Sequence, residues 1–119
     1  MKRKLQDEEI DFLFQGILSL KTIEECYDFF EDLCTVSELQ EMSRRLLAAK
    51  LLKQNCLYAD IAAQTGLSTA TISRVNRCLK YGSDGYVTVL DRLLKQESAQ
   101  KSGGDADLYA QGLSEKNKL

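Results

Sequence analysis

The chain has 119 residues, of which 44% are apolar and 29% charged, and its formal net charge is −2. These proportions are typical of one folded, soluble domain. Uninterrupted apolar runs stay far short of the roughly 20 residues that a membrane-spanning helix needs, and the first residues lack the apolar run of a secretion signal. The sequence therefore predicts a cytoplasmic protein that spans no membrane.

Residue types on which many enzymes depend are missing. The chain has no histidine, the commonest general base and metal ligand, and no two of its four cysteines have CxxC spacing. The sequence contains no nucleophile paired with a base, no glycine-rich phosphate loop and no metal-ligand cluster. We expect no enzyme activity, no metal and no cofactor. The thiols are predicted to be reduced and packed as small hydrophobic side chains, at Cys26, Cys34, Cys56 and Cys78.

The first third of the chain has the periodicity of amphipathic helices. Apolar positions recur at helical spacing over residues 10–18, and Thr22 begins a second helix with a capping box to Glu25. Both helices are apolar around more than half of their circumference, and a chain of this size has little core left to cover them. We expect residues 1–34 to form the shared core of a dimer. The alternative is a compact monomer whose C-terminal helix covers this surface.

The middle of the chain begins with a third helix and carries many of the basic residues. This linking helix is predicted within residues 35–57, where Thr35 and Glu38 form a second capping box. Residues 1–41 carry 11 acidic and 4 basic side chains, whereas residues 42–80 carry 7 basic side chains and one acidic one. A positive segment in an acidic protein indicates a surface that binds a polyanion, although most charged runs are only solvated helix faces.

Residues 58–80 have the pattern of a helix-turn-helix. Two short helical segments meet at Gly66, which permits the positive φ of a tight turn, and Ser68 is placed as the N-cap of the second segment. Leu67 is expected to fill the space under the turn. Apolar residues are predicted to pack the two segments together, at Ile61, Ala62, Ile72, Val75 and Leu79.

The last part of the chain completes the predicted domain. A final helix is expected over residues 84–96, so that residues 1–96 form a single helical domain. Beyond it the composition becomes polar and contains several glycines, which predicts a flexible tail over residues 97–119.

The exposed side of the second segment suggests contact with DNA. Small side chains near its N-terminal end let a helix approach base edges in the major groove, and arginine can bind phosphate or guanine. Basic residues outside this segment add phosphate contacts and a field that attracts DNA. The predicted DNA-binding residues are Ser68, Thr69, Ala70, Thr71, Ser73, Arg74, Arg77, Lys80, Arg44 and Lys53.

Two stretches of the sequence carry the most specific resemblance to a known family, CTVSELQEMSRRLLAAKLL and GLSTATISRVNRCLKYG. Through them the sequence resembles the Trp-repressor-like family, and most closely its YerC/YecD-type subgroup of small bacterial proteins; the similarity covers roughly residues 7–94. The resemblance implies an all-α, intertwined homodimer with a helix-turn-helix head in each subunit. It further implies a transcriptional regulator, a repressor, that binds a palindromic operator in double-stranded DNA of the nucleoid.

The resemblance also implies an effector pocket, with differences. In the Trp repressor two arginines sandwich the indole of tryptophan, and the matching residues are Arg45 and Arg74; Thr35 and Cys78 match two further residues of that pocket. In the Trp repressor the residue after the second arginine is a glycine, whereas Val75 follows Arg74 in this chain. The branched side chain of Val75 would intrude on the ligand. We therefore expect no tryptophan binding. The two arginines would contact DNA phosphates or a different, unknown small molecule.

An alternative function is that of a protein-interaction adapter. Such a protein would keep the helix-turn-helix as a scaffold without reading DNA specifically. Its partner would bind the acidic N-terminal part or the tail.

Overall fold

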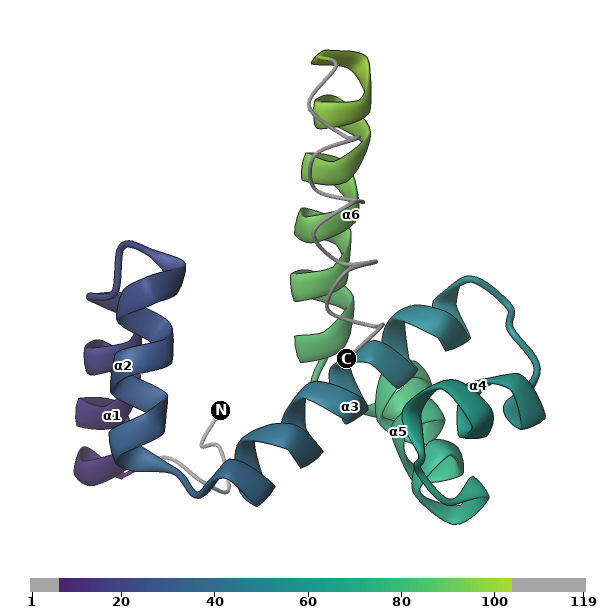
Figure 1. Cartoon of the computed structure of the whole chain (residues 1–119), viewed down its shortest axis with the longest axis horizontal. Coiled ribbons are helices and arrows are strands. Elements are labelled where there is room, and N and C mark those ends of the chain that lie inside the picture. Colours follow the sequence, from purple (N-terminus) through teal and green to yellow (C-terminus); the bar gives the residue numbers. More distant parts are fainter. Residues whose placement is uncertain (1–6, 104–119) are drawn as a thin grey trace. The chain divides into compact units, whose positions relative to one another are not determined.

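The computed structural model describes residues 7–103, with side chains over residues 7–98, and this part of the chain contains helices and no strand (Figure 1). The predicted all-α fold is confirmed. None of the described helices is long and apolar enough to cross a membrane. In chain order the helices are α1 (Glu8–Leu18), α2 (Ile23–Leu33), α3 (Val36–Lys53), α4 (Tyr58–Thr65), α5 (Thr69–Tyr81) and α6 (Gly85–Gly103).

Side-chain caps start α2 and α3 where the sequence predicts them. The Thr22 hydroxyl accepts a hydrogen bond from the Glu25 N–H at 3.1 Å, but the Glu25 carboxylate accepts from the Lys21 N–H, one residue before the expected partner. The box that starts α3 is reciprocal. Thr35 Oγ1 accepts from the Glu38 N–H at 3.1 Å, and Glu38 Oε1 accepts from the Thr35 N–H at 2.9 Å. Local sequence therefore determines both helix starts.

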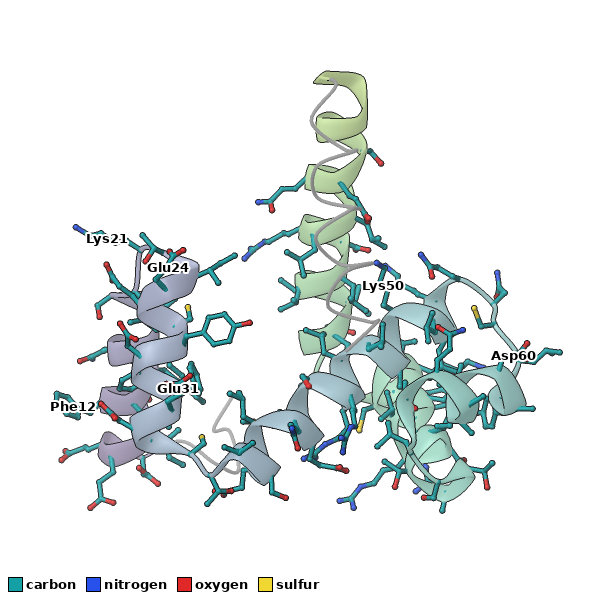
Figure 2. The ribbon with its side chains drawn as sticks, in the orientation of Figure 1. Phe12, Lys21, Glu24, Glu31, Lys50 and Asp60 are labelled. Carbon is teal, nitrogen blue, oxygen red and sulfur yellow. The ribbon has the colours of Figure 1, made fainter. Side chains whose placement is uncertain are left out.

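The described residues divide into two units, one before and one after the boundary between residues 43 and 44, and α3 begins in the first and ends in the second. In the first unit α1 and α2 lie side by side (Figure 1), and a methyl group added to Gly16 would come within 3.9 Å of the Phe29 ring. No residue between 7 and 43 is buried. Phe12 is 77% exposed and points away from the helix pair (Figure 2). The described part of this unit thus has no buried core.

The second unit has a compact apolar core to which four helices contribute. Its largest fully buried side chains are Ile61 of α4, Ile72 of α5 and Leu90 of α6, and burying each contributes roughly 1.5–3 kcal/mol. Because α5 supplies two of the core residues, its opposite face is held toward the outside. The buried apolar residues of this core are Ala48, Ala49, Leu51, Ile61, Leu67, Ile72, Val75 and Leu90.

The last helix is longer than predicted. The sequence places its end at residue 96 and the start of the tail at residue 97, whereas α6 continues to Gly103. Glutamate, alanine, glutamine and lysine, which follow residue 96, all favour helices. Glu97 also forms an ion pair with Lys50 of α3, at 4.0 Å between Nζ and Oε2. The rest of the predicted tail lies outside the described residues.

Candidate nucleic-acid interface

The turn between α4 and α5 has the predicted geometry. Gly66 ends α4 in the left-handed region with φ 75°, and its N–H donates to the Ala62 carbonyl at 2.9 Å. Leu67 is buried beneath the turn, at 7% exposure. The α4–turn–α5 segment, residues 58–81, is therefore a helix-turn-helix in which a short, tight connection fixes the angle between the helices.

Thr65 reinforces this turn, which sequence reasoning missed. Its side chain is buried, its hydroxyl donates to the Ile61 carbonyl at 2.7 Å, and the same oxygen accepts from the Leu67 N–H at 3.2 Å. One hydroxyl thus joins the end of α4 to the connection and satisfies a backbone N–H that the helix ends leave free. The signal in the sequence was a threonine directly before the turn glycine.

Two residues predicted to contact DNA are already used to cap α5. Ser68 Oγ accepts from the Thr71 N–H at 3.1 Å and the two side-chain hydroxyls are hydrogen-bonded at 3.0 Å. Ser68 is exposed, whereas Thr71 is half-buried. The cap confirms the predicted start of the helix. It also means that these two hydroxyls stabilise α5 before any ligand arrives.

The outer face of α5 carries the remaining predicted contacts of that helix, and all of them are exposed. Arg74 and Arg77 lie on the same side as the small residues of the first turns, and no acidic residue occurs between Asp60 and Asp84. The core residue Ile72 holds the opposite face against α4. A rigid helix with an exposed, cationic and partly small-residue face can enter a DNA groove. The predicted DNA-binding residues that are exposed on this face are Thr69, Ala70, Ser73, Arg74, Arg77 and Lys80.

The basic residues of α3 divide into two groups. Arg44 and Arg45 are exposed on the described surface. Lys53, by contrast, is half-buried and forms an ion pair with Asp91 of α6, and Lys50 pairs with Glu97. Because α6 supplies acidic partners from outside the basic segment, part of that segment's charge is compensated. The sequence pattern did not reveal these pairs.

The residues of the predicted effector pocket have separate structural roles. Thr35, in the first unit, is used in the α3 capping box, whereas Arg45, Arg74 and Cys78 are exposed in the second unit. Val75 is 3% exposed and belongs to the core, as predicted. A β-branched side chain is thus fixed at the position that the resemblance matches to a glycine of the Trp repressor.

The four thiols are free, but not all are packed as small hydrophobic groups. Cys34 and Cys56 are half-buried, whereas Cys26 and Cys78 are exposed. The prediction is wrong for these two. Cys26 lies on α2, in the first unit, whose described residues include no buried one. Cys78 lies on α5 beside the row of Ile72 and Val75, and this row, not Cys78, faces the core.

Fold and site together define an all-α helix-turn-helix protein, and comparisons with known proteins give the family. The family model described as Trp repressor protein matches residues 8–94. The chain is 52% identical over 99 residues to the uncharacterized protein YerC of Bacillus subtilis (strain 168). The aligned region covers 83% of this chain and 95% of YerC. The chain belongs to the Trp repressor family and is a Trp-repressor-like protein of YerC type, as its sequence predicted.

Solved structures agree with this assignment. The crystal structure of a TrpR-like protein from Eubacterium eligens ATCC 27750 has a TM-score of 0.73 and 56% identity, covering 76% of this chain and 93% of that one. A second crystal structure, of a candidate Trp repressor from Staphylococcus aureus, has a TM-score of 0.72 and 53% identity, covering 76% and 90% of the two chains. These structures confirm the predicted all-α, Trp-repressor-like fold of the chain.

Proposed function

We propose that the protein is a sequence-specific DNA-binding regulator of transcription. The observation that carries the proposal is the outer face of α5, which is exposed, cationic and free of acidic residues. Such a face attracts the phosphate backbone and lets the helix come close to base edges. The family also supports a helix-turn-helix regulator.

The side chains of this face have distinct proposed roles. Thr69, Ala70 and Ser73 are small enough to let the N-terminal half of α5 approach the floor of the major groove. Arg74 and Arg77 bind guanine or phosphate through their guanidinium groups. The other exposed cations, Lys80 and Arg44, contact phosphates, and Lys53 contributes less because Asp91 pairs with it. Ser68 and Thr71 act mainly through the cap of α5.

We propose further that the protein acts as an intertwined homodimer. The helices of residues 1–34 have no buried residue between 7 and 34 and expose large apolar side chains, which a second copy would cover. Two-fold symmetry then presents two α5 helices to the two halves of a palindromic operator. A dimer on its operator blocks access to a promoter, so repression is the proposed effect, in the cytoplasm on nucleoid DNA. The exposed apolar residues of α1 and α2 are Phe12, Phe14, Leu18, Ile23, Tyr27 and Leu33.

Tryptophan is not the proposed effector. Val75 is part of the core, so the slot that a glycine would leave open is filled. Arg45 and Arg74, both exposed, are available for DNA phosphates or for a small molecule of another class.

The proposal is tested by selecting duplex DNA from a random pool with the full chain and measuring affinity by fluorescence anisotropy. Arg74→Ala and Arg77→Ala should each weaken binding about 5- to 150-fold, corresponding to about 1–3 kcal/mol for the removal of an arginine that binds DNA. Arg92→Ala, which removes an exposed arginine of α6, is the matched control and should bind nearly as wild type. No DNA binding even at about 50 mM salt would contradict the proposal and favour the adapter function.

A further inference from the structure

Tyr81, the last residue of α5, is 84% exposed, whereas Tyr27 and Tyr58 are 49% and 36% exposed. Its hydroxyl has no hydrogen-bond partner within the described part of the chain. The backbone beneath it is well held, because the Gly82 N–H donates to the Cys78 carbonyl at 2.9 Å and closes the helix. The direction of the Cα–Cβ bond of Tyr81 is therefore set by the helix.

Tyr81 lies on the same side of α5 as the cationic face. With 3.6 residues per turn, Ala70, Arg74, Arg77 and Tyr81 fall within an arc of about 60° around the α5 axis. Ile72, which is fully buried, lies about 180° from Tyr81. Tyr81 therefore continues the stripe that begins with a small residue and passes through both arginines, and it points directly away from the core.

The position of Tyr81 along the axis places it beyond the base edges. At about 1.5 Å per residue, Tyr81 lies roughly 16 Å along the helix from Ala70, and the major groove is only about 12 Å wide. A helix whose first turns lie in the groove therefore brings its last turn to the phosphate backbone. A phenol O–H is a neutral hydrogen-bond donor of the kind that phosphate oxygens accept.

We infer that Tyr81 is a non-ionic contact to a DNA phosphate at the edge of the groove, where it fixes how far α5 enters. This inference rests on the proposed function. It assigns a DNA contact to a residue outside the set predicted from the sequence, and a contact of a different physical kind. Arginine contacts release counterions and are salt-dependent, whereas a phenol contact is not.

The test compares Tyr81→Phe with Arg77→Gln in the full chain on the selected duplex, at two salt concentrations. Tyr81→Phe removes one donor from an exposed position, and circular dichroism checks that the fold is unchanged. It should weaken binding about fivefold per subunit, as expected for the loss of one hydrogen bond, and leave the slope of log K against log salt unchanged. Arg77→Gln should lower that slope by about 0.9 for each phosphate that the arginine no longer neutralises.

Failure of the inference can be told apart from failure of the proposed function. If Arg77→Gln weakens binding but Tyr81→Phe binds as wild type, the inference is wrong and the DNA-binding function stands. A change of salt slope in Tyr81→Phe also overturns it, because a neutral donor carries no charge. If the wild-type chain binds no duplex, both the function and the inference are wrong.

Discussion

The ammonium group of Lys53, in the last turn of α3, forms an ion pair with the carboxylate of Asp91 on α6. Lys50, one turn earlier, pairs with Glu97 in the same way. Two of the seven basic residues in residues 42–80 thus form ion pairs with acidic residues outside that range. The cationic surface is therefore carried chiefly by α5 and by the exposed arginines of α3.

Asp91→Asn should strengthen DNA binding. The substitution frees the Lys53 ammonium for phosphate, so the salt dependence of binding should steepen by up to about 0.9 per subunit. The cost to folding should be small, about 0–1 kcal/mol, because both side chains are partly exposed. Anisotropy titrations at several salt concentrations measure the first effect and urea denaturation the second.

A double substitution provides the control. In a Lys53→Met background, Asp91→Asn should no longer change DNA affinity, because there is no ammonium group to release. An increase in affinity of the same size in both backgrounds would show that Asp91 acts by general repulsion of DNA.

The turn glycines should differ in their sensitivity to substitution. A methyl group on Gly66 meets nothing within 4 Å, so Gly66→Ala should cost about 1–2 kcal/mol through the left-handed backbone alone. A methyl group on Gly82 would lie 2.3 Å from the Cys78 carbonyl oxygen. Because that atom belongs to the backbone, Gly82→Ala must move the chain and should cost at least about 2 kcal/mol. Urea denaturation gives both values.

Gly85 serves as the comparison for these two variants. It starts α6, has no positive φ, and a methyl group there meets nothing within 4 Å. Gly85→Ala should leave stability unchanged or raise it, by up to about 1 kcal/mol. A larger loss for Gly66→Ala than for Gly82→Ala would contradict the close approach of the Cys78 carbonyl to Gly82.

Val75 should stabilise the core and exclude tryptophan. Val75→Ala removes two methyl groups from the core of the second unit and should cost about 1–3 kcal/mol. Isothermal titration of the wild-type chain with tryptophan should show no binding. Micromolar affinity for tryptophan would show that Val75 does not block the pocket.

The α3 cap should lose strength in acid. Hydrogen bonds from the Thr35 N–H and hydroxyl lower the pKa of Glu38. Since the folded chain favours the carboxylate, this contribution is present at neutral pH and is lost as the pH falls through the lowered pKa. Glu38→Gln should therefore lower the melting temperature slightly at neutral pH and make no difference in strong acid. A difference that persists unchanged in strong acid would rule out the carboxylate as its source.

Local signals in the sequence were enough to predict the elements that build the site. Ser68 as a cap, Gly66 at a positive φ and the apolar spacing from Ile61 to Val75 each act over a few residues, and the structure confirms all of them. The same holds for the cap at Thr35. These features are readable because hydrogen-bond chemistry and helical periodicity depend on near neighbours.

Contacts between distant residues were not readable. Lys53 and Asp91 are 38 positions apart, and nothing in either segment indicates that α6 lies beside α3. The sequence also predicts too short a last helix, because the composition after residue 96 is polar and contains glycines, although several of these residues favour helices. The structural roles of Thr65 and Thr71 are not evident in the sequence, since their hydrogen bonds form only once the turn is built.

The most direct test of DNA reading by α5 is nuclear magnetic resonance mapping of the full chain with and without its selected duplex. We expect the largest shift changes at Thr69, Ala70, Ser73, Arg74 and Arg77, with little change over the outer surface of α1 and α2. Changes confined to the acidic helices α1 and α2, or none on α5, would contradict the account.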